Sequence, residues 1–240
     1  MSRRSRRAKK RSASRRNLWI GVAVVVILVV GVVGYVVATR GGAGTATTSA
    51  GAGPFAVLDT SQGTIVLQLF PQDAPKTVAN FESLANSGFY NDLVWHRIVA
   101  GFIIQTGDPT SRDGGGNPAD WGDTGSNTTI PFETNSLPNA EGYVAMANTA
   151  PQGDGASSQF FIDLADNTNL NGQYTVFAQV VSGMNAVLAI GALPVSATCA
   201  SSGQLQCPPV DPGEAMLLSV TIETSLSTTS TTASTSAAAS

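Results

Sequence analysis

The alternation of apolar and polar positions between residues 55 and 223 predicts a series of short β-strands. The region opens with two β-rich runs, FAVLDT and TIVLQLF, which the turn residues SQG join into an expected hairpin. Further apolar runs follow: LVWHRIV, FIIQTG, YVAMAN, QFFIDL and TVFAQVV, and AMLLSVTIE is expected to be the last strand. Many short strands with turn-rich joints are typical of a closed antiparallel barrel.

Helical spacing occurs in two places within this region. Between Asp73 and Gly88 the apolar positions recur three and four residues apart, which predicts a helix with one apolar face. We expect Asp73 to cap this helix, Pro75 to lie in its first turn and Gly88 to end it. A second short helix is expected near Met184–Ile190. The predicted fold class is therefore mainly β, a closed antiparallel barrel capped by two helices.

A charge-free run of 21 residues, from Leu18 to Ala38, precedes the barrel. As a helix it measures about 31 Å, enough to cross a hydrocarbon core of roughly 30 Å. The alternative is a cleaved signal peptide, whose apolar region usually spans about 7–15 residues. The longer run favours an uncleaved transmembrane helix.

The charges of the chain are segregated around this run. The first 40 residues hold ten basic residues and no acidic one, and positive charge beside a span stays cytoplasmic. This predicts a single-pass cell-membrane protein with a cytoplasmic N-terminus and an extracytoplasmic body. Residues 41–240 carry three basic residues against 16 acidic ones, a net charge of −13, which argues against a nucleic-acid-binding body. One histidine and two cysteines are too few for a structural zinc site with four such ligands.

Composition divides the chain into five segments. Residues 1–17 form a basic cytoplasmic segment and 18–38 the transmembrane helix. Residues 39–54 contain 14 Gly, Ala, Ser or Thr, which is typical of a flexible linker. Residues 55–223 form one folded domain, and the Ser/Thr/Ala-rich residues 224–240 are expected to be a disordered tail.

Several polar residues lie within otherwise apolar strands. Arg97 and Gln105 fall on two neighbouring predicted strands, and Asn148 and Gln159 fall on two others. An arginine in such a strand needs acceptors, because an unpaired buried charge is costly. The pattern leaves two interpretations open for Arg97, a structural arginine bound to backbone carbonyls or a binding-site arginine.

Three segments resemble the cyclophilin family of peptidyl-prolyl cis/trans isomerases: WHRIVAGFIIQTGDPT, GYVAMANTAPQGDGASSQFFIDL and LNGQYTVFAQVVSGM. The family signature F-H-R-I-x-x-G-F-x-x-Q-x-G-D is matched by Trp95 through Asp108, with Trp95 in place of the usual phenylalanine. The resemblance implies an eight-stranded closed β-barrel with a helix at each end. It also implies isomerisation of X-Pro bonds in proline-containing polypeptides, with no metal or cofactor. With the span, and with arginine favoured over lysine, it indicates a membrane-anchored bacterial type.

The resemblance also assigns site residues one by one. It places the catalytic arginine at Arg97, the holder of the substrate carbonyl at Gln105, and a further candidate at His96. The remaining substrate-binding positions that it implies are Phe102, Ile103, Ala147, Asn148, Gln159, Phe161, Leu170 and Tyr174.

Some positions depart from the family pattern or lie outside it. Asn169 stands where many members carry a tryptophan that helps to bind cyclosporin, so cyclosporin-type ligands are expected to bind with reduced affinity. Tyr174 stands where many members carry a histidine. Cys199 and Cys207 are eight positions apart, and we expect them to form a disulfide in an oxidising compartment.

The function predicted from these observations is peptidyl-prolyl isomerisation that assists the folding of exported or cell-envelope proteins. The alternative is a catalytically weak binding module of the same fold, tethered to the membrane.

Overall fold

The computed structural model describes residues 53–148, 152–153, 155–196 and 207–226 of the 240-residue chain. The predicted cytoplasmic segment 1–17, the span 18–38, nearly all of the linker and most of the tail lie outside these residues. Among the described residues, no helix is both long and apolar enough to cross a membrane.

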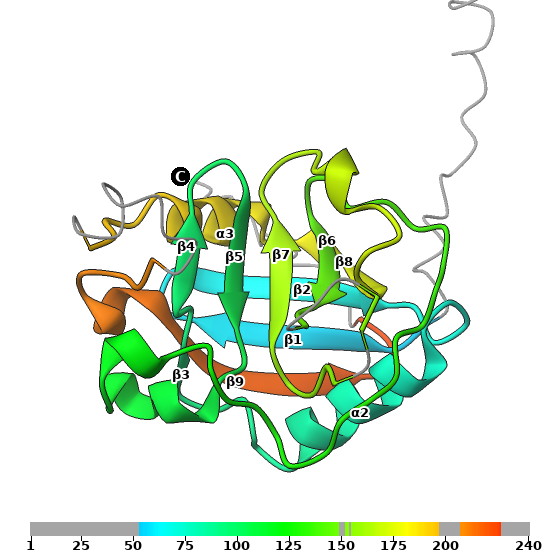
Figure 1. Ribbon diagram of the computed structural model, residues 1–240, viewed down its shortest axis with the longest axis horizontal. Coiled ribbons are helices and arrows are strands. Elements are labelled where there is room, and N and C mark those ends of the chain that lie inside the picture. Colours follow the sequence, from blue (N-terminus) through cyan, green and yellow to red (C-terminus); the bar gives the residue numbers. More distant parts are fainter. Residues whose placement is uncertain (1–52, 149–151, 154, 197–206, 227–240) are drawn as a thin grey trace, which may run out of the picture. The chain divides into compact units, whose positions relative to one another are not determined.

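Within the described residues, nine short strands form one antiparallel sheet, and two α-helices pack against it (Figure 1). The order along the sheet is β3-β9-β1-β2-β8-β6-β7-β5-β4. The strands are β1 (Phe55–Thr60), β2 (Gly63–Leu69), β3 (Leu93–Val94), β4 (Arg97–Val99), β5 (Ile103–Thr106), β6 (Tyr143–Met146), β7 (Phe160–Asp163), β8 (Val176–Ser182) and β9 (Met216–Glu223). The helices are α2 (Pro75–Asn86) and α3 (Met184–Gly191), and the 3-10 turns are η1 (Pro109–Gly114), η2 (Pro118–Asp120), η3 (Thr168–Leu170) and η4 (Pro212–Ala215).

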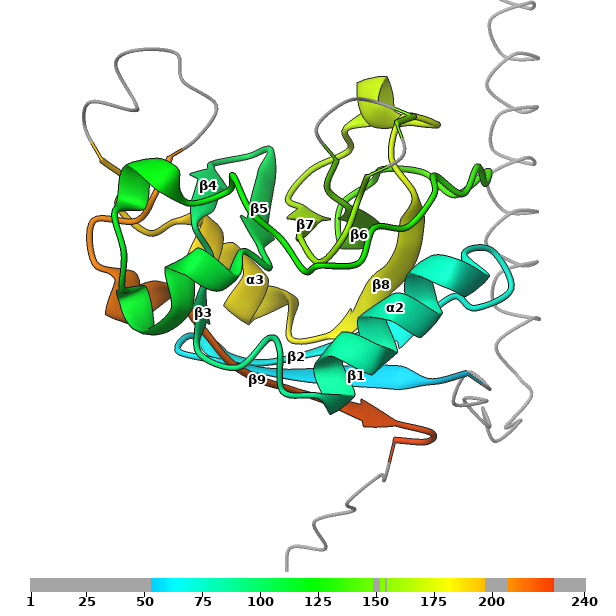
Figure 2. The same cartoon turned by 60° about the horizontal axis from the view of Figure 1, so that its bottom comes forward.

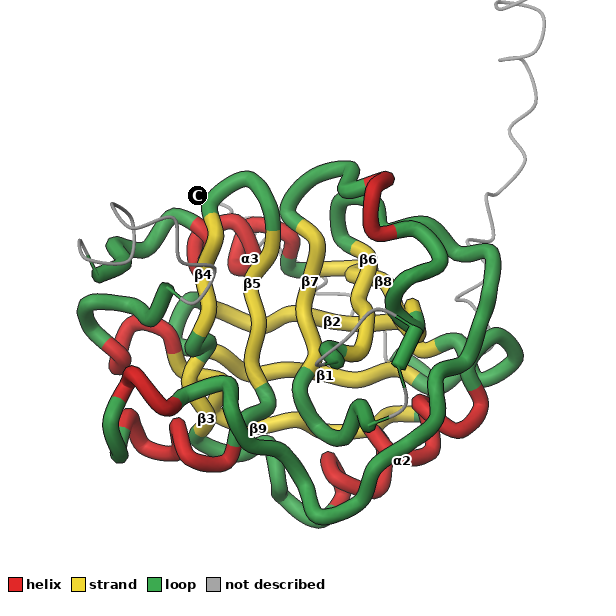
Figure 3. Tube along the Cα trace, in the orientation of Figure 1, coloured by secondary structure: helices red, strands yellow, loops and turns green. Residues whose placement is uncertain are grey.

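The sheet curls so that its two halves face each other across a common core. In Figure 3, β4, β5 and β7 run across the direction of β1, β2 and β9. Helix α2 packs on β9, whereas α3 contacts β2, β4 and β5, so the helices cover different parts of the sheet (Figure 2). The second helix, predicted near Met184–Ile190, is confirmed.

The expected closed, eight-stranded barrel is wrong in detail, because the curled sheet keeps two edges, β3 and β4. The run predicted as one strand over residues 93–99 is divided at Trp95 and His96. Its first part pairs with β9 through Leu93, and its second part pairs with β5 through Arg97. The ladder is interrupted because the chain crosses here from one half of the sheet to the other. A covalent segment, rather than a ladder, therefore joins the two edges.

The first hairpin is confirmed, but the predicted cap of the first helix is not. Strands β1 and β2 pair from Phe55↔Gln68 to Thr60↔Gly63. Helix α2 begins at Pro75 as expected, yet no side chain of the preceding segment caps it. Instead, Glu133 arrives from a distant loop, and its carboxylate accepts from the Lys76 and Thr77 amides at 3.0 and 2.8 Å. A tertiary contact from Glu133 therefore caps the helix in place of Asp73, the residue that the sequence predicted.

Strand β7 shows how the sheet separates a core face from an outer face. Successive side chains of a strand point to opposite sides. Phe160 and Ile162 accordingly lie in the main core, where the Phe160 ring packs edge-on against Trp95 at 5.8 Å between centroids. Phe161 belongs to a second, smaller apolar cluster. The outer face carries the candidate site.

Candidate active site

A row of cross-strand neighbours on the outer face brings the predicted catalytic and binding residues together. Arg97 on β4 pairs with Gln105 on β5, Gln105 pairs with Phe161 on β7, and Phe161 pairs with Ala145 on β6. Directly opposed residues in an antiparallel ladder have their Cβ atoms about 4.5–5.5 Å apart. The register of four strands therefore sets the guanidinium and the apolar cluster on one surface.

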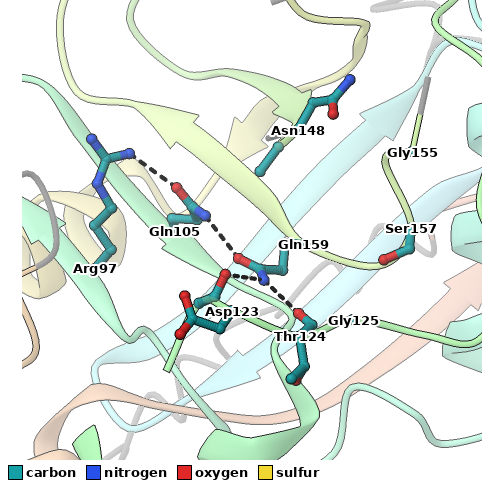
Figure 4. Close-up of a pocket in the computed structure, with 11 residues that line it drawn as sticks. Arg97, Gln105, Asp123, Thr124, Gly125, Asn148, Gly155, Ser157 and Gln159 are labelled. Atoms are coloured by element: carbon teal, nitrogen blue, oxygen red, sulfur yellow. Dashed lines mark hydrogen bonds between the residues drawn. The ribbon is translucent and has the colours of Figure 1, made fainter. Parts of the chain in front are cut away.

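Three side chains of this surface form a continuous chain of hydrogen bonds (Figure 4). The Arg97 guanidinium donates to Gln105 Oε1 at 3.0 Å. The Gln105 amide nitrogen donates to Gln159 Oε1 at 2.8 Å, and both glutamine side chains are buried, at 8% exposure. Because each amide is bonded at both ends, the guanidinium is held in one orientation.

The chain of hydrogen bonds ends on a loop that walls the site. Gln159 Nε2 donates to the backbone carbonyls of Gly122 and Thr124, at 2.9 and 2.5 Å (Figure 4). Together the strands and the loop enclose a cavity of about 550 Å³. Its lining residues are Arg97, Gln105, Gly122, Asp123, Thr124, Gly125, Ala147, Asn148, Gly155, Ser157 and Gln159.

The smaller apolar cluster adjoins this cavity. Its buried members are Ile103, Ala145, Phe161 and Val176, and Phe102, Leu137, Tyr143, Ala147, Leu170 and Tyr174 pack against them. The rings of Phe161 and Tyr174 meet edge to face with centroids 5.3 Å apart. Since Ala147 belongs to both groups, the polar cavity and the apolar cluster form one continuous surface.

His96, the remaining candidate, lies between β3 and β4, directly before Arg97 in the chain, and is not among the residues that line the cavity. It is 1% exposed, and its ring lies close to the Gln159 side chain and the Val94 backbone without a hydrogen bond of full geometry to any described residue. Burial lowers the pKa of His96 to about 4, although the Asp108 carboxylate opposes that shift. His96 is therefore neutral at pH 7, is absent from the cavity lining and is not placed to contact a ligand there.

The Arg97 guanidinium is the one cationic group of the cavity lining. Burial lowers the pKa of Arg97 from its ordinary value, but an arginine stays charged at neutral pH. Arg112 behaves differently, because its guanidinium donates to the backbone carbonyls of Phe89 and Asn91. Of the two interpretations that the sequence left open, the structural one describes Arg112, whereas Arg97 lines a cavity.

The structure thus assembles the predicted residues in two adjoining groups. Arg97, Gln105, Ala147, Asn148 and Gln159 line the cavity, and Phe102, Ile103, Phe161, Leu170 and Tyr174 belong to the apolar cluster. The loop residues 122–125, Gly155 and Ser157 also line the cavity and were not predicted, since no spacing rule marks an irregular polar loop as a cavity wall.

The predicted disulfide lies partly outside the described residues. Cys207 is 7% exposed and is disulfide-bonded. Cys199 lies outside the described residues, so its pairing with Cys207 stays a prediction.

This arrangement combines one fixed cationic donor, several amide groups and an adjacent apolar surface. Such a site suits an extended peptide that carries an apolar ring. The apolar cluster can receive the ring, while the side-chain amides of the cavity bind the peptide backbone. A peptide bound in this way would place the bond that precedes the ring beside the donor.

Known proteins resemble this chain in sequence. The family described as "Cyclophilin type peptidyl-prolyl cis-trans isomerase/CLD" matches residues 55–206. Peptidyl-prolyl cis-trans isomerase-like 1 of Aspergillus niger is 40% identical over 137 residues, covering 55% of this chain and 78% of the relative. Peptidyl-prolyl cis-trans isomerase ppi1 of Schizosaccharomyces pombe is 38% identical over 134 residues, covering 56% and 83%.

A solved structure resembles the fold as well. The cyclophilin-type isomerase of Cryptosporidium parvum, crystallised in the presence of the dipeptide Ala-Pro, superposes with a TM-score of 0.58 at 26% identity. The match covers 70% of this chain and 98% of that one. Family match, relatives and fold agree, and the chain belongs to the cyclophilin-type peptidyl-prolyl cis-trans isomerases.

Proposed function

We propose that this isomerase is a membrane-anchored, bacterial-type cyclophilin that acts on X-Pro bonds of exported or cell-envelope proteins and assists their folding. The observation that carries the assignment of its active site is the Arg97 guanidinium, held by Gln105 at 3.0 Å beside the apolar cluster. The apolar run 18–38 and the basic residues before it support the anchor and the extracytoplasmic position of the domain.

Arg97 is the proposed catalytic residue. Rotation about an X-Pro bond is opposed by amide resonance, with a barrier of about 18–20 kcal/mol. Twisting the bond by a quarter turn localises a lone pair on the proline nitrogen. A guanidinium that donates to that nitrogen binds the twisted state more strongly than either planar one, and only such a differential interaction accelerates the step.

The other site residues hold the substrate around that bond. Phe102, Ile103, Phe161 and Leu170 receive the proline ring, with Tyr174 at the rim against Phe161. Gln105 holds the substrate carbonyl, while Ala147, Asn148 and Gln159 contact the flanking backbone. None of these side chains has to form a covalent bond to the substrate, so the proposed mechanism needs no nucleophile.

The test of this mechanism compares two arginines within the described residues. Arg97→Ala should lower kcat/KM on an Ala-Pro peptide by roughly 10- to 150-fold, the value of a charge-assisted hydrogen bond of about 1.5–3 kcal/mol. Arg97→Lys should recover little, because one ammonium does not reproduce the fork of donors. The matched control is Arg112→Ala, which removes the same charge but should reduce stability and leave turnover per folded molecule unchanged.

The alternative function, a catalytically weak binding module, predicts a different result in the same assay. Turnover of the full chain would then be near the uncatalysed rate, while peptide titration would still show binding. Near wild-type turnover from folded Arg97→Ala would instead refute the catalytic role of Arg97.

The proposed location has its own test. Protease added to intact cells should digest a tag placed after residue 226 and spare a tag placed before residue 3, and the chain should sediment with membranes. A soluble product that begins after residue 38 would show cleavage rather than anchoring. Recovery of the intact chain from the soluble cytoplasm would contradict the proposal.

Reduced affinity for cyclosporin is proposed from a single position. Asn169 is exposed on η3 and offers no indole ring or indole N–H to a ligand. Loss of an aromatic anchor at an interface costs about 2 kcal/mol, or roughly thirtyfold in affinity. Asn169→Trp should therefore lower the inhibition constant with little change in turnover, and equal potency on both proteins would remove Asn169 from the explanation.

A further inference from the structure

Asp108, the last residue of the family signature, lies directly behind the cavity wall and outside the site itself. Its side chain is fully buried, and its two oxygens accept five hydrogen bonds from nearby loops. Oδ1 accepts from the Thr110 amide and from the hydroxyls of Thr110 and Thr124, at 2.8, 2.7 and 2.5 Å. Oδ2 accepts from the amides of Gly122 and Thr124, at 2.6 and 3.1 Å.

The carboxylate therefore binds the same two residues whose carbonyls hold Gln159. At Gly122 and Thr124, the backbone N–H points to Asp108 and the carbonyl oxygen accepts from Gln159 Nε2. Burial raises the pKa of Asp108, but the hydrogen bonds from Thr124 and Thr110 outweigh it and hold the pKa below its usual range. The group is thus ionised at neutral pH and can only accept.

The loop carbonyls determine which atom donates and which accepts in each hydrogen bond from Gln159 to Gln105 and Arg97. Carbonyl oxygens accept and never donate, so Gln159 must turn its nitrogen to the loop and its oxygen to Gln105. Gln105 must then donate with its nitrogen, which leaves its oxygen for Arg97. If the loop moved away, Gln159 could rotate, and a rotated Gln105 would present an N–H to the guanidinium instead of an acceptor.

We propose that Asp108 is a positioning residue for the isomerisation: by fixing the loop 122–124, it sets the polarity of the Gln159–Gln105 chain and thereby the orientation of the Arg97 guanidinium. This inference rests on the proposed catalytic role of Arg97. Asp108 touches no substrate, and its effect passes through four hydrogen-bonded steps: from Asp108 to the loop, from the loop to Gln159, from Gln159 to Gln105, and from Gln105 to Arg97.

The test is a double-variant cycle on the full chain, with kcat/KM measured on an Ala-Pro peptide at a temperature where circular dichroism shows every variant folded. Asp108→Ala should lower kcat/KM by about 10- to 100-fold, the loss expected when a reacting group is misplaced by about 1 Å. In an Arg97→Ala background the same substitution should change kcat/KM less than threefold. Its effect on the melting temperature should be the same in both backgrounds.

The matched control is Asp211, which begins a second Asp-Pro turn. Its carboxylate accepts from the Gly213 amide at 2.9 Å, much as Asp108 accepts from Thr110, but it does not bind the cavity loop among the described hydrogen bonds. Asp211→Ala should leave kcat/KM within twofold of wild type. If Asp108→Ala does not fold, Thr124→Val removes one of the five hydrogen bonds, and the same cycle should show a several-fold effect that is lost without Arg97.

Two results would overturn the inference. One is unchanged kcat/KM per folded molecule of the Asp108 or Thr124 variant, which would make Asp108 a purely structural residue. The other is an equal loss with and without Arg97, which would mean that Asp108 acts by another route. Failure of the proposed function gives a distinct result, because Arg97→Ala alone would then retain turnover.

Discussion

Two buried carboxylates of this isomerase, Asp108 behind the cavity and Asp163 at the end of β7, have opposite surroundings. Both side chains are fully buried. Asp108 accepts five hydrogen bonds, whereas Asp163 Oδ1 accepts one, from Asn167 at 2.7 Å, and Asp163 Oδ2 has no partner among the described residues. The pKa of Asp108 is held below its usual range, while burial raises the pKa of Asp163 to about 7.

The comparison shows that burial alone does not decide the charge of a carboxyl group. Taking a carboxylate out of water disfavours its charged form and raises its pKa, whereas hydrogen bonds to the charged form stabilise it and lower the pKa. At Asp108 five hydrogen bonds keep the carboxylate charged, and the carboxylate in turn holds the loop 122–124. At Asp163 the single hydrogen bond from Asn167 does not offset burial, so the pKa of the carboxyl group is raised to about 7.

The largest expected effect comes from removing the satisfied carboxylate. Asp108→Ala leaves three backbone amides and two hydroxyls without their acceptor at one site, and it should lower the free energy of unfolding by on the order of 4 kcal/mol. Asp163→Ala, measured beside it by urea unfolding at pH 8, should cost far less, because the charged group there has one donor to lose. Equal losses for the two variants would remove the distinction between the sites.

The pH dependence of stability should separate the two sites next. The folded pKa of Asp163, about 7, lies above its unfolded value of 3.8, so the stability that the protonated group contributes is lost as the pH rises through about 7. Between pH 5 and pH 8, wild type should therefore lose about 2–3 kcal/mol relative to Asp163→Asn. Parallel stability curves for the two proteins would show an ordinary pKa at Asp163.

His96 should produce the opposite slope, which Asp163 partly masks. Its folded pKa of about 4 lies below the ordinary 6.5, so its contribution is present above pH 6.5 and is lost as the pH falls toward 4. In Asp163→Asn, unfolding should therefore become easier by about 2 kcal/mol between pH 6.5 and 4.5. Adding His96→Asn should remove most of that slope, and a slope that persists would assign it to other groups.

The smallest effect concerns a third carboxylate, at the start of α2. Glu133 accepts from the amides of Lys76 and Thr77, and loss of a helix cap costs about 0.5–2 kcal/mol. Glu133→Ala should lower the free energy of unfolding by about that amount, whereas Asp73→Ala, the cap that the sequence predicted, should change it by a few tenths. The reverse order of effects would restore the sequence-based assignment.

Local patterns predicted the elements of the fold better than their connections. The β1–β2 hairpin follows from short-range alternation and turn residues, and a short helix is expected near Met184–Ile190; both are confirmed. The division of residues 93–99 and the cap by Glu133 depend on partners far away along the chain. No window of sequence contains both members of such a pair.

The same limit applies to the candidate site. Arg97, Gln105 and Gln159 lie on or beside regular strands, so a motif with fixed spacing places them, and the structure brings them together. The loop 122–125 and Ser157 complete the cavity from irregular segments that no spacing rule describes. From the sequence, Asp108 was recognised only as the last residue of the family signature. Its proposed effect on Arg97 depends on five hydrogen-bond donors whose positions the sequence does not give.

The pairing of the first strand with the last also bears on how the protein is made. Phe55 pairs with Glu223, so β1 gains its outer neighbour only after 168 further residues have been added. At about 5–20 residues per second, a ribosome takes roughly 8–34 s to supply them. During that time the β1 edge of the hairpin is open, and until β8 is made the β2 edge is open as well, which invites pairing with other chains. This enzyme of the folding pathway therefore passes through its own aggregation-prone interval, which ends when β9 leaves the ribosome.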